Sequence, residues 1–115
     1  MMEDKKYKLS LYSNFDIAQK KTREYLGRNT ELFISPRKDK KYRVYDPFND
    51  KWIDFGQMEY EDFTKHKDND RRLRYLKRAT NIKGNWKNNP YSPNNLSLHV
   101  LWDYKWNMLS YWFPV

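Results

Sequence analysis

Two groups of basic side chains are the feature of this 115-residue sequence that most directly suggests a chemistry. The first group is Arg37, Lys38, Lys40 and Lys41, and the second is Arg71, Arg72, Arg74, Lys77 and Arg78. Cations bind phosphates and aromatic rings stack on bases, so such groups with tyrosine and tryptophan between them suit sequence-independent nucleic-acid binding. The same charges could instead keep an aromatic-rich protein in solution or pair with acidic surfaces of other proteins. The candidate contacts for a polyanion or a protein partner are Arg37, Lys38, Lys40, Lys41, Arg71, Arg74 and Arg78.

The sequence offers little for catalysis. Its two histidines, His66 and His99, are far apart and belong to no H-E-x-x-H pair, so neither is expected to bind a metal. The three glycines are too widely spaced for a phosphate-binding loop. One carboxylate cluster could perform acid–base chemistry, but a salt-bridged surface corner is the favoured interpretation because lysines and a histidine follow it. Its members are Asp54, Glu59, Glu61 and Asp62. We therefore predict a non-enzymatic protein without a cofactor or a metal.

The composition indicates a folded chain with an acidic partner. Lysine and arginine outnumber aspartate and glutamate by 23 to 15, which gives a formal net charge of +8. The 10 tyrosines, 6 phenylalanines and 5 tryptophans are untypical of disordered chains, because aromatic rings bury large apolar areas. The absence of cysteine excludes disulfides and thiolate catalysis. No apolar run is long enough to span a bilayer, and no apolar segment follows the charged start, so we expect a soluble protein that is not exported.

Three β-favouring segments predict a small antiparallel meander. They are separated by turn-forming residues and cover residues 32–35, 41–45 and 52–55. In the second strand, Tyr42 and Val44 are expected on one face. A further strand is expected at residues 7–11, where Tyr7, Leu9 and Leu11 alternate with polar residues.

Helices are expected before and after this meander in the sequence. Asn14 or Asp16 caps a helix that ends at Leu26 before Gly27, with inward residues Phe15, Ala18, Thr22, Tyr25 and Leu26. A short helical turn at residues 59–63 is expected to pack Tyr60 and Phe63 on the sheet. Asp68 or Asp70 then begins an amphipathic helix with Leu73, Leu76 and Thr80 on one side and Arg71, Arg74 and Arg78 on another.

The C-terminal third of the sequence is expected to form a linker and a buried segment. Residues 81–95 are rich in asparagine and proline, which favours an extended connection. Residues 96–109 predict a buried helix, and the apolar residues 111–115 are expected to dock on the core or on a neighbour. The docking residues are predicted to be Trp102, Trp106, Trp112 and Phe113. We therefore expect an α+β fold with an aromatic-rich core, a meander packed with two or three helices, and four segments: 1–30, 31–82, 83–95 and 96–115.

The sequence resembles a family of small basic proteins encoded by nucleocytoplasmic large DNA viruses. The resemblance covers roughly residues 32–106, and its most specific part ends at Arg78. It is carried by the segments 34–44 (ISPRKDKKYRV), 53–56 (IDFG) and 60–68 (YEDFTKHKD), and by Arg71, Arg72, Tyr75 and Arg78. Trp86 and the Leu101-Trp102 pair look like later aromatic positions of that family. Residues 87–95 depart from its pattern, and the first 30 residues lie outside it.

This resemblance implies where the protein is found and not what it does, since the family has no established activity. The setting is a virus particle, or the virus factory in the host cytoplasm. In the favoured hypothesis the protein is a minor capsid protein, present in many copies, that cements major and minor capsid proteins. In the alternative, the basic groups bind viral DNA or RNA during packaging or in the core. The third hypothesis, a nuclease or hydrolase, would need the carboxylate cluster.

Overall fold

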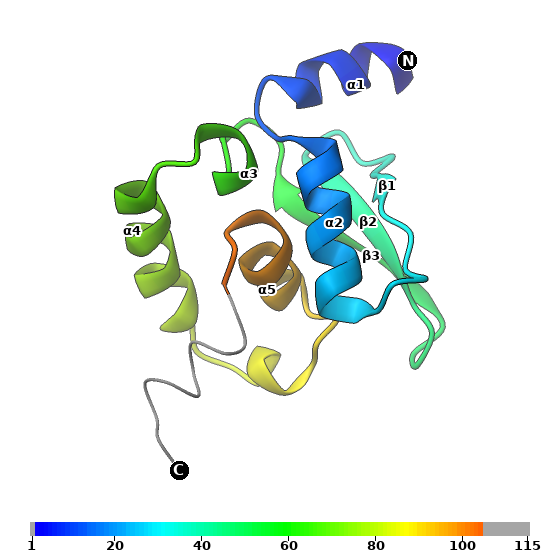
Figure 1. Ribbon diagram of the computed structural model, residues 1–115. Helices are drawn as coiled ribbons and strands as arrows, with labels where there is room; N and C mark the ends of the chain where they lie inside the picture. The colour runs from blue at the N-terminus through cyan, green and yellow to red at the C-terminus, as the bar shows by residue number, and fades with distance from the viewer. Residues whose placement is uncertain (1, 105–115) are drawn as a thin grey trace.

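A three-stranded antiparallel sheet with helices packed on one face forms the body of the protein (Figure 1). The structure, a computed structural model, describes residues 2–104. Its helices and strands are α1 (Met2–Ser10), α2 (Phe15–Leu26), β1 (Phe33–Ile34), β2 (Lys40–Asp46), β3 (Lys51–Gln57), α3 (Phe63–His66), α4 (Asn69–Thr80), the 3-10 helix η1 (Trp86–Asn88), α5 (Pro93–Leu96) and the π-helix η2 (Ser97–Leu101). The α+β class and the aromatic clusters predicted from the sequence are confirmed.

The meander forms as the sequence predicts, with strand order β1-β2-β3. Tyr42 lies opposite Phe55, and Val44 lies opposite Ile53. Because side chains alternate across a strand, Tyr42, Val44 and Phe55 all point into the core, where each is fully buried. The residues between them, Arg43 and Asp54, face the other side of the sheet, as do Tyr45 and Trp52.

Helix α2 covers the inner face of the sheet. It is capped by Asn14, whose Oδ1 accepts a hydrogen bond from the amide of Ile17 at 3.1 Å, and it ends at Gly27, which has a φ of +119°. Phe15 packs against Tyr42 of the sheet, with ring centroids 6.1 Å apart. Of the predicted inward residues, Ala18 and Thr22 are buried, so the cap, the end and the central part of the inward stripe are confirmed.

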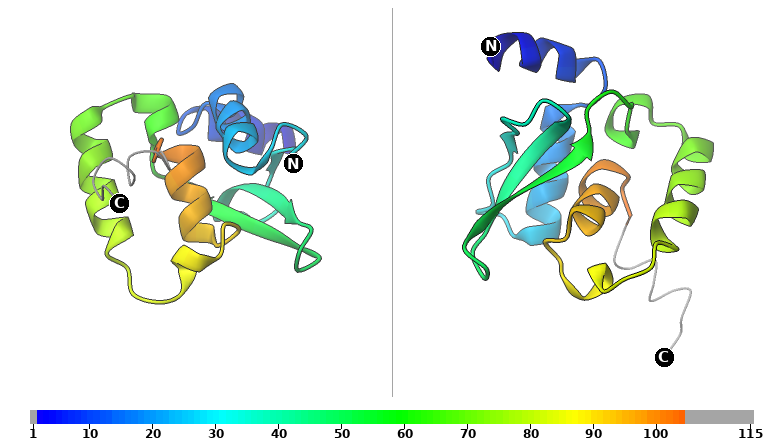
Figure 2. Two further views of the ribbon diagram at one scale, coloured as in Figure 1. Left: turned by 60° about the horizontal axis from the view of Figure 1, so that its bottom comes forward. Right: turned by 180° about the vertical axis from the view of Figure 1, so that it is seen from behind.

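The central element of the fold is the continuous helical segment α5–η2. It packs against α2 and β3, and Figure 2 shows α4 on its other side. Residues 95–102 are buried, including Leu96, Leu98 and Leu101. The buried helix predicted at 96–109 is thus confirmed up to Leu101, while residues 105–109 and the predicted docking segment 111–115 lie outside the described residues.

The predicted extended linker is partly helical. Residues 81–95 contain the whole of η1, and α5 begins within them at Pro93. The side chain of Asn95 helps to hold this segment in its folded conformation, because its amide donates to the carbonyls of Trp86 at 2.8 Å and Asn89 at 2.9 Å. Asparagine therefore supplies internal hydrogen bonds here and does not merely interrupt regular structure.

The strand predicted at residues 7–11 is wrong, because residues 2–10 form the helix α1. Lys5 and Leu9 are four residues apart and so share one helical face. On that face Leu9 is buried, and the ammonium of Lys5 donates to the carbonyls of Ser35, Arg37 and Lys40. These long-range contacts favour the helix and outweigh the short apolar alternation that predicted a strand.

Two predictions about the next helices need correction. The short helix α3 begins at Phe63, the last residue of the turn predicted at 59–63, because Asp62 caps it by accepting from the amide of Thr64 at 3.0 Å. Tyr60, which the prediction packed on the sheet, is exposed. In α4 the buried residues are Leu76 and Ala79, whereas Leu73 is exposed.

The core joins all four segments that the sequence analysis distinguished. It contains Leu9 and Ala18 from residues 1–30, Tyr42 and Phe55 from 31–82, Tyr91 from 83–95, and Leu96 and Leu101 from 96–115. No helix between Met2 and Tyr104 is both long enough and apolar enough to cross a membrane.

Candidate functional site

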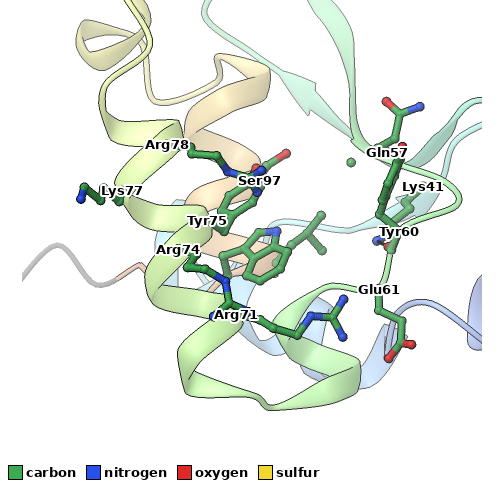
Figure 3. A pocket seen from close by; sticks show the side chains of 13 residues that line it. Lys41, Gln57, Tyr60, Glu61, Arg71, Arg74, Tyr75, Lys77, Arg78 and Ser97 are labelled. Carbon is green, nitrogen blue, oxygen red and sulfur yellow. Dashed lines mark hydrogen bonds between the residues drawn. The ribbon is translucent and has the colours of Figure 1, made fainter.

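A pocket of about 710 Å³ lies between α4 and the segment that follows β3 (Figure 3). We call it the basic groove. One wall is α4, the opposite wall is the chain from Gly56 to Glu61, and the floor comes from the end of the central helix. The residues that line it are Arg71, Arg74, Tyr75, Lys77 and Arg78 on the first wall, Gly56, Gln57, Tyr60 and Glu61 on the second, and Lys41, Ser97, Leu101 and Trp102 at the floor.

The cations of the α4 wall have no carboxylate partner among the described residues. They are Arg71, Arg74 and Arg78, which the helical periodicity predicts, and Lys77, which the sequence places in the same basic group. Lys77 and Arg78 lie in the last turn, where the helix dipole favours positive charge. Arg71 and Arg74 lie in the first half, where the dipole gives them no such support. Helix stability therefore does not account for the whole set.

Helix α4 begins where the sequence predicts, at a strong cap. Oδ1 of Asp68 accepts from the amides of Asp70 at 2.9 Å and Arg71 at 3.2 Å. Arg72, grouped with these cations in the sequence, has a different role. Its Nε donates to the carbonyl of Trp102 at 3.1 Å and its Nη2 to the carbonyl of Asp103 at 2.9 Å, which attaches α4 to the end of η2.

At the floor of the basic groove, Trp102 stacks on Tyr75 of the α4 wall. The rings of Tyr75 and Trp102 are 4.1 Å apart and tilted by only 7°. Trp102, predicted as a docking residue, is therefore buried inside its own domain; Trp106, Trp112 and Phe113 lie outside the described residues. The stack gives α4 a rigid position beside the central helix.

The side chain of Lys41 lies at the floor of the basic groove, a position that the sequence does not predict. It belongs to the predicted surface group of the β1–β2 turn, yet its side chain is buried and lies 2.9 Å from Oδ2 of Asp62. Its ammonium also donates to the carbonyl of Tyr60. Burial lowers the pKa of Lys41, and the carboxylate of Asp62 opposes that effect. Lys41 is thus a neutralised structural cation and not a surface contact of the turn.

The rest of the first basic group lies at the β1–β2 turn, away from the basic groove. Arg37 pairs with Asp39 at 3.3 Å, whereas Lys38 and Lys40 have no ion pair with any described carboxylate. The ammonium of Lys5 joins this turn through the carbonyl of Lys40 at 2.8 Å. Sequence reasoning missed Lys5, because only the fold brings α1 beside the turn. The structure therefore separates the two predicted groups.

The predicted carboxylate cluster is not brought together. Asp62 pairs with Lys41, Glu59 pairs with Lys8 at 3.1 Å, and Glu61 lines the groove alone. Asp54 faces the outer side of the sheet, 3.1 Å from Nε of Arg43. Burial acts against ionisation of Asp54, but hydrogen bonds from Ser35 and Arg43 keep its pKa below the ordinary value. Asp54, Glu59 and Asp62 are thus engaged in three separate ion pairs.

The two histidines also have different surroundings. Nδ1 of His66 accepts from the amide of Asp68 at 2.9 Å, which places this ring at the start of α4. His99 stacks on Tyr25, with ring centroids 4.1 Å apart, and burial lowers its pKa to about 4. Across residues 2–104, no three histidine, aspartate or glutamate side chains gather as a metal site would require.

The outer face of the sheet carries an aromatic surface that sequence reasoning missed. Trp52 is 46% exposed and lies edge-on to Phe33 at 5.5 Å and to Tyr45 at 5.4 Å. The guanidinium of Arg43 lies 5.1 Å above its ring. We call these four residues the sheet aromatic cluster. The predicted strands could have indicated it, since Tyr45 and Trp52 are cross-strand partners.

Comparison with known proteins gives one partial similarity. No curated protein and no solved structure matches the chain. Residues 30–79 match the model of a family of unknown function, DUF5754. The matched residues include the three strands, α3 and α4 up to Ala79, so they contain Lys41, Asp62 and the cations of the groove wall. The similarity assigns no activity, and the viral setting inferred from the sequence stays a prediction.

Proposed function

We propose that this protein binds nucleic acids without sequence preference and that the basic groove is its phosphate-binding surface. The observation that carries the proposal is the α4 wall, whose four groove-lining cations have no described carboxylate partner. Each cation that meets a phosphate releases condensed counterions, so a row of them binds any sequence. The net charge of +8 adds a long-range attraction to any polyanion.

The proposal gives the protein a binding role and no catalytic one. Glu61 is the only carboxylate among the described groove residues, and the neighbouring Asp62 is engaged in an ion pair with Lys41. The partner is a viral DNA or RNA, and the location is the virion core or the virus factory. Both follow from the family resemblance of residues 32–106.

Binding to labelled DNA at several salt concentrations tests this proposal. Replacing Arg71, Arg74 and Arg78 by alanine removes three cations, so the log–log dependence of affinity on salt should flatten by about 2 in slope, at about 0.7–0.9 for each phosphate contact. The matched control replaces Lys20, Arg28 and Lys83, three exposed cations outside the groove. Equal losses in both triple variants would show that net charge, and not the groove, determines binding.

A second candidate function is favoured by the sheet aromatic cluster. Tyrosine, tryptophan and arginine dominate protein–protein contacts, and Trp52 offers both a ring and a bound guanidinium. This supports the role of a minor structural protein that cements other capsid proteins in a large DNA virus particle. Mass spectrometry of purified particles stripped with detergent and nuclease tests it. Retention in the shell fraction supports this role, and loss with the nucleic acid supports the binding proposal.

A further inference from the structure

The two walls of the basic groove differ in charge. Arg71, Arg74 and Arg78 stand on the α4 wall, where Lys77 also lines the groove but directs its side chain away from it, and the opposite wall presents Gln57, Tyr60 and Glu61 (Figure 3). Lys41 does not offset this difference, because the carboxylate of Asp62 neutralises it within the core. A phosphate is therefore attracted to the α4 wall and repelled by Glu61 on the other. The groove is polarised across its width.

The wall that repels phosphates has the groups that suit a base. Tyr60 is 69% exposed, so its ring is available to stack on another ring. Gln57 beside it is exposed and can both donate and accept hydrogen bonds, and Glu61 can accept from an exocyclic amino group. Stacking on an aromatic ring tolerates any base, which agrees with binding that lacks sequence preference.

The shape of the groove excludes a duplex from this arrangement. Its volume of about 710 Å³ is typical of a site for a small molecule and not of a surface that follows a double helix. A duplex is convex and keeps its bases stacked inside, so it can touch the rim cations but cannot reach Tyr60 with a base. A single strand can turn one base out into the groove.

We propose that the basic groove holds an unstacked nucleotide of a single-stranded nucleic acid, with its phosphates on Arg71 and Arg74 and its base on Tyr60. This inference rests on the proposed function and adds the strand type and the orientation of the ligand. It assigns Tyr60 a binding role that neither its sequence pattern nor the family similarity indicates. The buried pair of Lys41 and Asp62 holds the Tyr60 wall in place through the carbonyl of that tyrosine.

Fluorescence anisotropy with three labelled ligands tests the proposal. The ligands are a single strand of oligothymidylate of about 12 nucleotides, an abasic strand with the same number of phosphates, and a duplex of the same length. The full-length protein should bind the oligothymidylate about fivefold or more tightly than the abasic strand. Tyr60→Ala should abolish that difference, because one lost stacking contact accounts for about that factor. Tyr60→Phe, which keeps the ring, should preserve it.

Two controls make a negative result informative. Tyr7→Ala removes an equally exposed tyrosine outside the groove and should leave all three affinities unchanged. Tyr60 is exposed, so the circular dichroism spectrum of Tyr60→Ala should match that of the unaltered protein. Equal binding of the abasic strand and the oligothymidylate, or no effect of Tyr60→Ala, would overturn this inference and leave the proposed function standing. Absence of binding to all three ligands would overturn both.

Discussion

The ammonium group of Lys41 lies 2.9 Å from Oδ2 of Asp62, and their side chains are only 2% and 1% exposed. Removing two charges from water is costly, so such a pair persists only when its remaining hydrogen-bonding groups are satisfied. Oδ1 of Asp62 accepts from the amide and the hydroxyl of Thr64, and that hydroxyl lies 3.2 Å from Oγ of Ser13. Ser13 in turn accepts from the hydroxyl of Tyr42 at 2.8 Å. The network ties the sheet, α3 and the α1–α2 connection together beneath the basic groove.

Loss of Lys41 should destabilise the protein strongly. Lys41→Met leaves the carboxylate of Asp62 buried without its cation, which should lower the free energy of unfolding by about 3–5 kcal/mol. Urea unfolding followed by circular dichroism measures the change. The control is Lys8→Met, which breaks the exposed pair with Glu59 and should cost less than about 1 kcal/mol. Similar effects of the two substitutions would contradict the role given to the buried pair.

Gly56 should tolerate no side chain. Its φ is +83°, and a Cβ there would lie 2.9 Å from Cδ1 of Leu101 and 3.2 Å from Cβ of Lys41. We expect Gly56→Ala to lower the free energy of unfolding by about 2 kcal/mol or more, through backbone strain and overpacking together. Gly84 has a φ of +118° with no atom within 4 Å of the added carbon. Gly84→Ala therefore isolates the backbone strain and should cost less when both variants are compared by urea unfolding followed by circular dichroism.

The stability of the protein should fall with pH in the range where an ordinary histidine gains its proton. Burial lowers the pKa of His99 to about 4 in the folded protein, from 6.5 for an unperturbed histidine. The unfolded state therefore binds more protons between these values, and the free energy of unfolding falls as pH decreases from 6.5 to 4. The loss is on the order of 3 kcal/mol and ends below pH 4.

Unfolding by urea at pH 7, 6, 5 and 4 measures this dependence. His99→Gln should flatten it, because the variant has no group at this position that titrates in the range. Burial also lowers the pKa of His66, so His66→Gln is measured in parallel and should remove a separate part of the slope. An unchanged slope in His99→Gln would show that the stacked ring is not the group responsible.

The cap of α4 should contribute measurably to stability. Asp68→Ala leaves the amides of Asp70 and Arg71 without their acceptor and should cost about 1 kcal/mol. Asp68→Asn keeps an acceptor oxygen at this position, so it should cost much less. Differential scanning calorimetry compares the two. A large loss in both variants would indicate that the charge of Asp68, and not its hydrogen bonds, stabilises the helix.

Local patterns in the sequence were sufficient for most of the regular elements. Asn14 and Gly27 mark the ends of α2, Asp68 marks the start of α4, and the turn residues between Leu32 and Phe55 separate the strands. Each signal acts within a few residues, through a cap, a turn or a period of side chains, so it can be seen without the fold. The arginines of the groove wall were visible for the same reason, because helical spacing alone brings Arg71, Arg74 and Arg78 together.

What the sequence determined by itself is therefore the three strands, the helices α2 and α4, the basic face of α4 and the absence of cysteine chemistry. The tertiary structure alone decided that residues 2–10 are helical, that Lys41 is buried on Asp62, and that Tyr60 stands across a groove from Arg71 and Arg74. These outcomes depend on contacts between residues far apart in the chain. Whether a charged side chain stays hydrated or is buried depends on which residues pack over it. No local sequence pattern carries that information.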